Sequence, residues 1–183
     1  GTSSTNITID YYYGQSFGDR FGQLARSYTT TPQGATITLG PGESYPERAH
    51  DRGDLEDGQY SMVIRSSGGQ IVAIVNQVNM NDNTTAASYD AFSSGSRKLN
   101  LPNIVRNYAT YQSPIVVQNV GTQPSQVTVT YYYGERAQNG PSFKDQGLQG
   151  QVAYQETVTI QPGANRPFRI HDVQALNGRD GQY

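Results

Sequence analysis

The alternation of apolar and polar residues predicts β-strands along most of the chain. In NITIDYYYG (residues 6–14) and QVTVTYYYG (126–134), apolar or aromatic residues fill every second position, which is the spacing at which side chains of an extended strand share one face. Other β-branched runs end at Gly, Ser, Asn or Pro, as strands do at turns; they cover residues 35–39, 60–66, 70–80, 87–92, 99–105, 114–121 and 151–160. Because no stretch keeps apolar residues three and four positions apart, we expect almost no helix.

Much of the first third of the chain recurs near its end. NITIDYYYG aligns with QVTVTYYYG, and ATITLGPGESYPERAHD (35–51) aligns with TVTIQPGANRPFRIHD (157–172). Pro162 follows Pro41 by 121 positions, and DGQY at 57–60 returns at 180–183. The spacing drifts only from 120 to 123 positions, which indicates a duplicated structural unit with a period of about 121 residues and small changes in loop length.

The period fits into the 183 residues about one and a half times. The chain therefore divides into a first half (1–60), a unique middle (61–123) and the first half again (124–183). We predict an all-β protein with two immunoglobulin-like β-sandwich domains, covering residues 1–97 and 98–183, and with seven or so strands in a complete unit. In this frame the first domain lacks its first strands and the second lacks its last strands.

Incomplete sandwiches would expose sheet edges, and an unpaired edge recruits further strands. Three interpretations stay open at this point. The chain is a piece of a longer tandem array, or neighbouring copies complete its edges in a polymer, or each sandwich closes with fewer strands.

Composition narrows the class of protein. The chain has 13 Lys and Arg against 15 Asp and Glu, so it lacks the basic surface that nucleic-acid binding requires. The longest aliphatic run, IVAIV at 71–75, has five residues, whereas a helical membrane span needs about 20. We expect no membrane span, and we expect this run at the buried centre of a sheet.

Without cysteine there is neither a disulfide nor a thiolate metal site. Low charge and high polarity are typical of secreted, β-rich cell-surface proteins, and the start GTSSTN fits either a mature terminus left by signal-peptide removal or an artificial boundary.

The tyrosine triplets give the candidate interface residues. By strand alternation Ile7 and Ile9 share one face, as do Val127 and Val129, while Tyr12 and Tyr132 point to the other. An outward tyrosine on a threonine-lined face suits a protein interface or stacking on a sugar, although an ordinary cross-strand pair would look the same. The candidate interface set is Tyr12, Tyr132, Ile7, Ile9, Val127 and Val129.

Residues with catalytic or ligand chemistry are few. His50 and His171 occupy equivalent Arg-X-His-Asp segments, but neither has a nucleophile at a recognisable spacing, so we interpret both as structural and expect no enzyme activity. The acidic loop from Asp51 to Asp57 offers oxygen ligands for calcium, yet its spacing departs from the EF-hand pattern. No catalytic residue, cofactor or metal site is predicted, and calcium binding by this loop is left open. Candidate glycosylation sites are Asn6 and Asn83.

Three stretches resemble a known kind of protein. VVQNVGTQPSQVTVTYYYG (116–134), TVTIQPGANRPF (157–168) and IVAIVNQVN (71–79) resemble bacterial cell-surface tandem β-sandwich repeats of the immunoglobulin or fibronectin-like kind, which occur in stalks, adhesins and extracellular filaments. The resemblance implies an extracellular structural subunit at the cell surface, a homopolymer that assembles head to tail while neighbours complete the sandwich edges. The alternative is an adhesin or carbohydrate-binding stalk module whose partners are cell-surface glycans.

Overall fold

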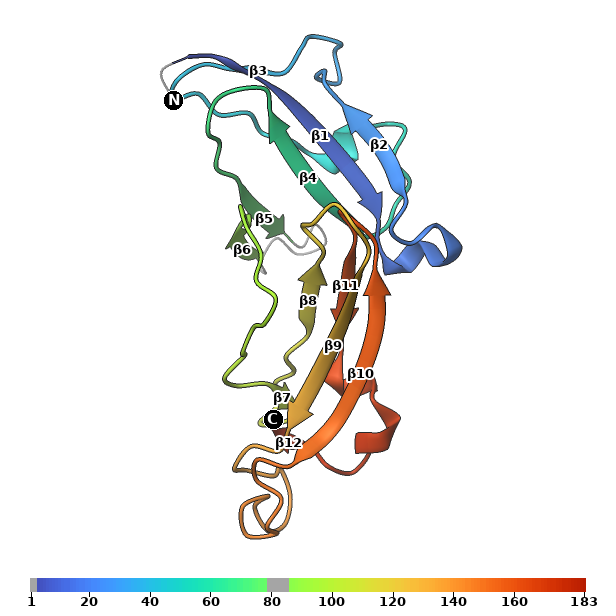
Figure 1. The fold of residues 1–183 in the computed structure, drawn as a ribbon, viewed down its shortest axis with the longest axis vertical. Helices are drawn as coiled ribbons and strands as arrows, with labels where there is room; N and C mark the ends of the chain where they lie inside the picture. The colour runs from blue at the N-terminus through green and yellow to red at the C-terminus, as the bar shows by residue number, and fades with distance from the viewer. Residues whose placement is uncertain (1–2, 79–85) are drawn as a thin grey trace.

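The computed structural model of the protein describes residues 3–78 and 86–183 (Figure 1). These residues form twelve strands and four short 3-10 helices, without an α-helix. The expected all-β character with almost no helix is therefore confirmed. In the described ranges no helix has both the length and the apolar character that crossing a membrane requires.

An N-terminal lobe, residues 3–71, is built around one long strand. Strand β1 (Thr5–Tyr13) pairs antiparallel with β4 (Tyr60–Ser66) along one edge. Its other edge pairs first with β3 (Thr38–Leu39) and then with β2 (Leu24–Tyr28). The 3-10 helices η1 (Gln15–Arg20) and η2 (Ala49–Asp51) lie in the connections. The buried core residues of this lobe are Ile7, Ile9, Tyr11, Ala25 and Ile37.

A C-terminal lobe, residues 104–183, contains three strand pairs. Strand β9 (Ser125–Tyr132) pairs with β10 (Val152–Ile160), and β8 (Ile115–Gln118) pairs with β11 (Asn165–Phe168). Short strands β7 (Val105–Arg106) and β12 (Gly181–Gln182) form the third pair. Helices η3 (Ile170–Asp172) and η4 (Gln174–Leu176) follow β11. The core of this lobe consists of Tyr131, Tyr133, Phe143, Ile170, Leu176 and Tyr183.

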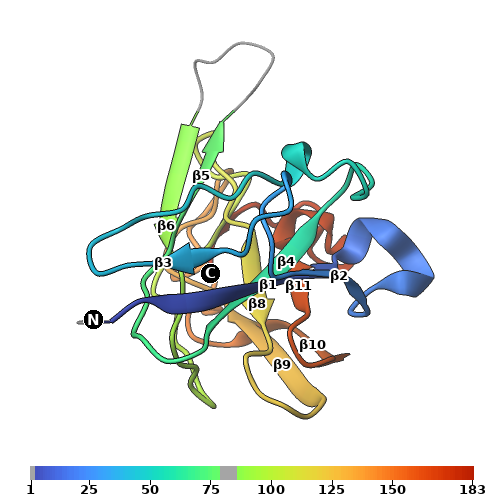
Figure 2. The same ribbon diagram turned by 90° about the horizontal axis from the view of Figure 1, so that it is seen from above.

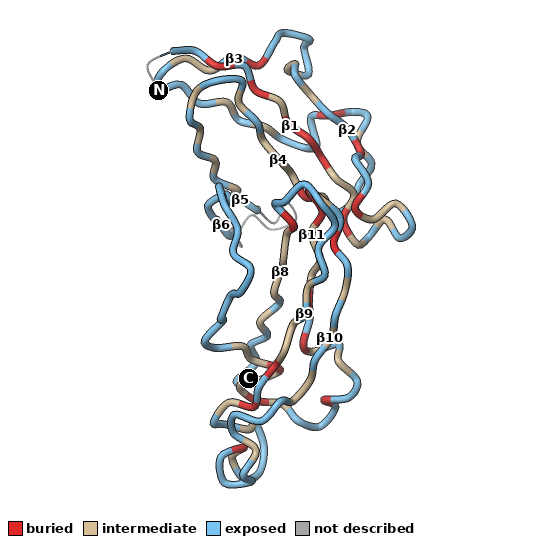
Figure 3. The backbone as a smooth tube through the Cα atoms, viewed as in Figure 1, coloured by how far each residue is buried: buried red, intermediate tan, exposed pale blue. Residues whose placement is uncertain are grey.

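Strands β5 (Ile74–Val78) and β6 (Ala86–Asp90) form a hairpin that projects away from both lobes (Figure 2). The expectation that residues 71–75 form a buried sheet centre is wrong, because Val72 is 97% exposed and Ile74 is 64% exposed. Strand β5 pairs with β6 outside the two cores, so the Ile74 side chain stays in water. The exposed residues are visible as pale blue in this part of Figure 3. The boundary between residues 97 and 98 stays a prediction.

The two tyrosine triplets close their strands with the same local contacts. The Tyr13 and Phe17 rings lie 4.8 Å apart at 60°, and so do those of Tyr133 and Phe143. The amide of Gly14 donates to the carbonyl of Gln59 at 2.8 Å, and Gly134 donates to Gln182 at the same distance. A glycine amide can approach this closely because a Cβ at either position would clash with the facing backbone.

Candidate functional site

The two lobes meet where β1 ends and where the turn between β10 and β11 begins (Figure 1). The Tyr12 ring lies against Gly163, so closely that a Cβ at position 163 would be 2.6 Å from Cζ of Tyr12. The Ser61 hydroxyl donates a buried 2.7 Å hydrogen bond to the Gly163 carbonyl. Beside them, a Cβ on Gly22 would lie 3.2 Å from side-chain atoms of Ala164 and Gln161. We name this set of contacts the lobe junction.

The turn on the C-terminal side of the lobe junction is held rigidly by Asn119. The Gly163 amide donates to the Asn119 carbonyl, and the Asn119 amide donates to the Ala164 carbonyl, both at 2.9 Å. The buried Asn119 side-chain amide also donates to the carbonyls of Ile160 and Gln123. Gly163 has φ of +77°, a conformation that disfavours any side chain. The turn therefore presents a fixed, side-chain-free surface to Tyr12.

Features that resemble both sides of the lobe junction recur on exposed surface. Tyr132, the middle tyrosine of the second triplet, is 52% exposed at the end of β9. The turn Gly40-Pro41-Gly42 follows β3, and its Pro41 and Gly42 are exposed. Gly42 has φ of +76° and no neighbouring atom within 4 Å of its Cβ position. These two surfaces lie at opposite ends of the molecule in Figure 1.

One edge of β9 is a second exposed feature. Strand β1 is covered on both edges, whereas β9 pairs with β10 alone among the described residues. Coverage by β4 buries Ile7 and Ile9, but Val127 and Val129 on β9 remain half-buried. A free strand edge presents unpaired backbone donors and acceptors and can accept an added strand.

The structure divides the candidate interface residues into three groups. Ile7 and Ile9 lie in the N-terminal core, so they are not available to a partner while β4 stays in place. Tyr12 lies in the lobe junction. Tyr132, Val127 and Val129 remain accessible at the free end and edge of β9, where an interface role stays a prediction.

Of the two candidate glycosylation sites, Asn6 is exposed on β1. Its side-chain oxygen accepts a 2.9 Å hydrogen bond from the Thr38 hydroxyl. Asn83 lies outside the described residues. Glycosylation of either residue stays a prediction.

The histidines and the acidic loop make local contacts. His50 and His171 each lie beside the aspartate that follows, with Nε2 to Oδ1 distances of 3.0 and 3.4 Å. In the loop, Asp54 accepts hydrogen bonds from Arg26 and Tyr28, and Glu56 pairs with Arg20. The described ranges contain no group of three or more acidic, histidine or cysteine side chains placed to hold a metal.

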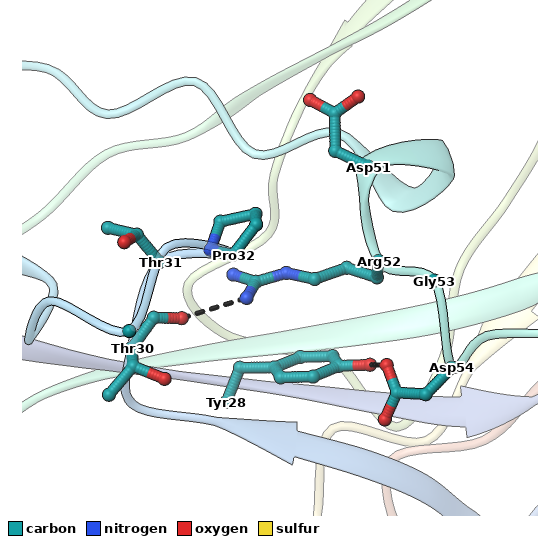
Figure 4. Close-up of a pocket in the computed structure, with 9 residues that line it drawn as sticks. Tyr28, Thr30, Thr31, Pro32, Asp51, Arg52, Gly53 and Asp54 are labelled. Carbon is teal, nitrogen blue, oxygen red and sulfur yellow. Dashed lines mark hydrogen bonds between the residues drawn. The ribbon is translucent and has the colours of Figure 1, made fainter.

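A shallow polar pocket of about 260 Å³ lies between this loop and residues 30–34 (Figure 4). Its central side chain is Arg52, which stacks on the Tyr28 ring at 4.1 Å and donates to the Thr30 carbonyl at 2.8 Å. The remaining donors of Arg52 form a two-point ion pair with Glu47 at 2.8 Å. Because the guanidinium is fully engaged within the protein, it offers no free positive charge to a ligand, and we interpret Arg52 as structural.

The Arg52 and Glu47 side chains are only 3% and 8% exposed. Burial by itself would raise the pKa of Glu47, but hydrogen bonds from Arg52 and from the Tyr11 hydroxyl outweigh it and hold the pKa below its usual range. Burial and the nearby Glu47 charge raise the pKa of Tyr11 well above its ordinary value. These groups therefore fix the loop to β1 as a charged, hydrogen-bonded cluster.

Sequence reasoning missed most of the lobe junction. The Pro-Gly turn at 162–163 is recognisable in the sequence as a turn, but nothing local indicates that Tyr12, Gly22 and Ser61 pack on it. The only available signal was the outward position of Tyr12 on its strand. Comparison of the chain with protein-family models, with curated proteins and with solved structures finds no match.

Proposed function

We propose that the protein is a structural subunit of an extracellular surface filament, in which copies assemble head to tail and complete one another's exposed sheet edges. The observation that carries the proposal is the difference between two similar strands. Strand β1 has β4 on one edge, and the same edge of β9 lacks a strand among the described residues. Edges of this kind are used in nature for assembly by strand addition.

We infer that the two lobes are copies of one immunoglobulin-like β-sandwich unit that repeats after about 121 residues. The inference is supported by the shared contacts of Gly14 and Gly134. It is also supported by a second amide contact, because Gly22 donates to the carbonyl of Tyr13 and Gly150 donates to that of Tyr133, both at 2.8 Å. Fold similarity alone carries no function, so the proposal rests on the exposed edge.

The inferred equivalence gives a register for the added strand. Tyr60 starts β4 opposite Tyr13, and Tyr183 packs on Tyr133 in the same manner, with ring centroids 5.9 and 5.6 Å apart. Consider a strand that continues from Tyr183 as β4 continues from Tyr60. Its second residue after Tyr183 would pair with Tyr131 and its fourth residue with Val129. In β4 those positions are Met62 and Ile64, which pack on the core. The β9 edge is thus suited to an alternating, half-apolar strand.

Exposed apolar side chains supply a driving force for association. Burying such side chains against a neighbouring copy would remove apolar surface from water, which favours association. Large apolar side chains are exposed just before and within the hairpin, in the connection that follows it and on β8; they are Val72, Ile74, Phe92, Leu99 and Val116.

Electron microscopy of the native surface material, combined with the intact mass of the dissociated chain, tests the proposal. Regular filaments built from chains of 20.0 kDa support it. A single chain several times heavier would show that the edges are completed by the same polypeptide, and the homopolymer would be excluded.

A second experiment tests the β9 edge directly. Extending the chain after Tyr183 with Ser-Met-Val-Ile-Arg-Ser, the sequence of residues 61–66, should cover β9 from within the same molecule. We expect the extended protein to unfold at higher urea and to assemble less, because the edge is occupied. An extension of six Gly and Ser residues is the control and should change neither property. Equal behaviour of the two extensions would contradict strand addition at β9.

A second candidate function is glycan binding, which the exposed ring of Tyr132 favours. Tyr12 is committed to the lobe junction, so of the two middle tyrosines it is Tyr132 that is left for a sugar contact. Binding on a glycan array that is lost in Tyr132→Ala, with the protein remaining monomeric, would favour this function over assembly.

A further inference from the structure

We propose that copies of the protein join by repeating the lobe junction between molecules, with Tyr132 of one copy packing on Gly42 of a second copy. This contact rests on the proposed assembly function and specifies which surfaces meet. The occupant of the exposed turn at residues 40–42 is thus a second copy of the chain, through the end of β9 that carries Tyr132, which we name the Tyr132 end.

The Tyr132 end reproduces the side of the junction that Tyr12 provides. Each tyrosine is the middle member of its triplet, and each has a neighbouring glycine, Gly22 or Gly150, with φ of +79°. These glycines make the same 2.8 Å hydrogen bond to the last tyrosine of their triplet. Each middle tyrosine also pairs with an exposed apolar residue on the neighbouring strand. Tyr12 pairs with Leu24, and Tyr132 pairs with Val152.

The turn at residues 40–42 reproduces the other side of the lobe junction, which the turn at residues 161–164 provides. In the junction the Ala164 amide donates to the Gln161 carbonyl at 3.1 Å, and in the exposed turn the Glu43 amide donates to the Gly40 carbonyl at 3.1 Å. Gly42 and Gly163 have φ of +76° and +77°. The space over Gly42 is empty within 4 Å, whereas Tyr12 fills the space over Gly163. A tyrosine ring therefore has a prepared surface at Gly42.

The exposed turn differs from the junction turn at two positions, with Gly40 in place of Gln161 and Glu43 in place of Ala164. Ala164 is fully buried at the lobe junction, and Glu43 occupies the corresponding place in the exposed turn. The Glu43 carboxylate folds back and accepts a 2.7 Å hydrogen bond from the Gly40 amide. It is thus satisfied within its own turn, and the glycine surface stays open. Removing the charge with Glu43→Ala should strengthen association, because it makes the turn more like the junction.

The placement of the two surfaces makes the contact repeatable. They lie at opposite ends of the long axis in Figure 1, and the lobe junction lies between them. An interface that joins two different surfaces is heterologous, and when its rotation does not close a ring it generates an open filament. Each added copy would present a fresh Tyr132 end.

Sedimentation velocity of the purified 183-residue chain over a range of concentrations measures this association. We expect Tyr132→Ala and Gly42→Ala each to weaken it at least tenfold, since one removes the ring and the other places a methyl group where the ring sits. Tyr132→Phe keeps the ring and should associate as the wild type does. Gly178→Ala is the matched control, because Gly178 has φ of +78° and an equally open Cβ position outside the proposed contact.

The outcomes separate this inference from the proposed function. If the wild type associates and the two variants associate equally well, the Tyr132–Gly42 contact is overturned while assembly stands. If the purified chain stays monomeric but native material contains filaments of it, the contact is likewise overturned. If the variants weaken association as expected and native material contains no filaments, the contact is upheld and the filament function fails.

Discussion

The Tyr12 ring occupies the space that a side chain on Gly163 would need, with only 2.6 Å between Cζ of Tyr12 and the Cβ position of residue 163. A strand end in the N-terminal lobe and a turn in the C-terminal lobe are thereby in direct contact. The buried hydrogen bond from Ser61 to the Gly163 carbonyl adds a polar link at the same place. The two lobes are therefore joined by specific packing as well as by the connecting chain.

The first prediction concerns this contact. Gly163→Ala and Gly42→Ala both place alanine at a positive φ, which costs roughly 1–2 kcal/mol. Only Gly163→Ala also forces a methyl group into the Tyr12 ring, and overpacking adds about 1–3 kcal/mol. Urea unfolding at concentrations where the protein is monomeric should show the larger loss for Gly163→Ala. Equal losses would mean that the ring moves aside without cost.

The second prediction concerns the buried ion pair of Arg52 and Glu47. Arg52→Met leaves the Glu47 carboxylate buried without its charged partner, so we expect the free energy of unfolding to fall by about 3–5 kcal/mol. Arg26→Met removes an exposed pair with Asp54 and should cost only a small part of that. Thermal or urea unfolding compares the two. A loss from Arg52→Met no larger than from Arg26→Met would contradict a structural role for the cluster.

The third prediction is a loss of stability in acid. The pKa of Glu47 is lower in the folded protein than its ordinary value of 4.5, because Arg52 and Tyr11 stabilise the carboxylate more than burial penalises it. Protonation therefore favours the unfolded state. The contribution is fully present above pH 4.5 and is lost as the pH falls through the lowered folded value. Unfolding measured at pH 7 and pH 3 should show a smaller acid loss in a Glu47→Gln, Arg52→Met variant than in the wild type.

The fourth prediction compares Tyr11 and Tyr131, the first tyrosines of the two triplets. The Tyr11 hydroxyl donates to Glu47 at 3.0 Å, whereas the Tyr131 hydroxyl is buried with no hydrogen-bond partner among the described residues. Tyr11→Phe should cost about 1.5–3 kcal/mol, because it removes a hydrogen bond to a charged group. Tyr131→Phe should be neutral or stabilising, because it removes an unsatisfied polar group. Urea unfolding should therefore show a loss of stability for Tyr11→Phe and no loss for Tyr131→Phe.

The environment of Tyr131 gives that comparison an independent check. Burial, with a smaller effect of the Glu156 charge, raises the pKa of Tyr131 to about 12. An absorbance titration of the phenols should therefore lose a late component in Tyr131→Phe. Loss of an early component instead would show that this ring is exposed in solution.

The sequence predicted the local features of the fold well. Period-two alternation placed Ile7 and Ile9 on one face of a strand and Tyr12 on the other, and in the structure Ile7 and Ile9 belong to the N-terminal core while Tyr12 packs on Gly163. The failure at Val72 and Ile74 has a specific cause. Hydropathy reports that a segment would be favourable to bury, but whether it is buried depends on which strand it pairs with, and β5 pairs with β6 outside the cores.

The candidate site was predictable only in part. Strand alternation distinguished Tyr12 and Tyr132 from their neighbours, because it is a property of adjacent residues. The partner of Tyr12 was not predictable, since Gly163 is 151 positions away in the sequence and a glycine carries no side-chain signal. The same holds for Glu47 and Arg52, whose charges read as solvated surface until Tyr11 and Tyr28 are placed around them.

By itself the sequence determined the all-β character, the turns and the recurrence of one segment pattern, because each depends on residues close together in the chain. Only the tertiary structure decided which strand covers which edge, which tyrosine is enclosed between the lobes and which is left in water. Those outcomes depend on contacts between distant segments, where backbone pairing and close packing of particular surfaces outweigh the preferences of individual residues.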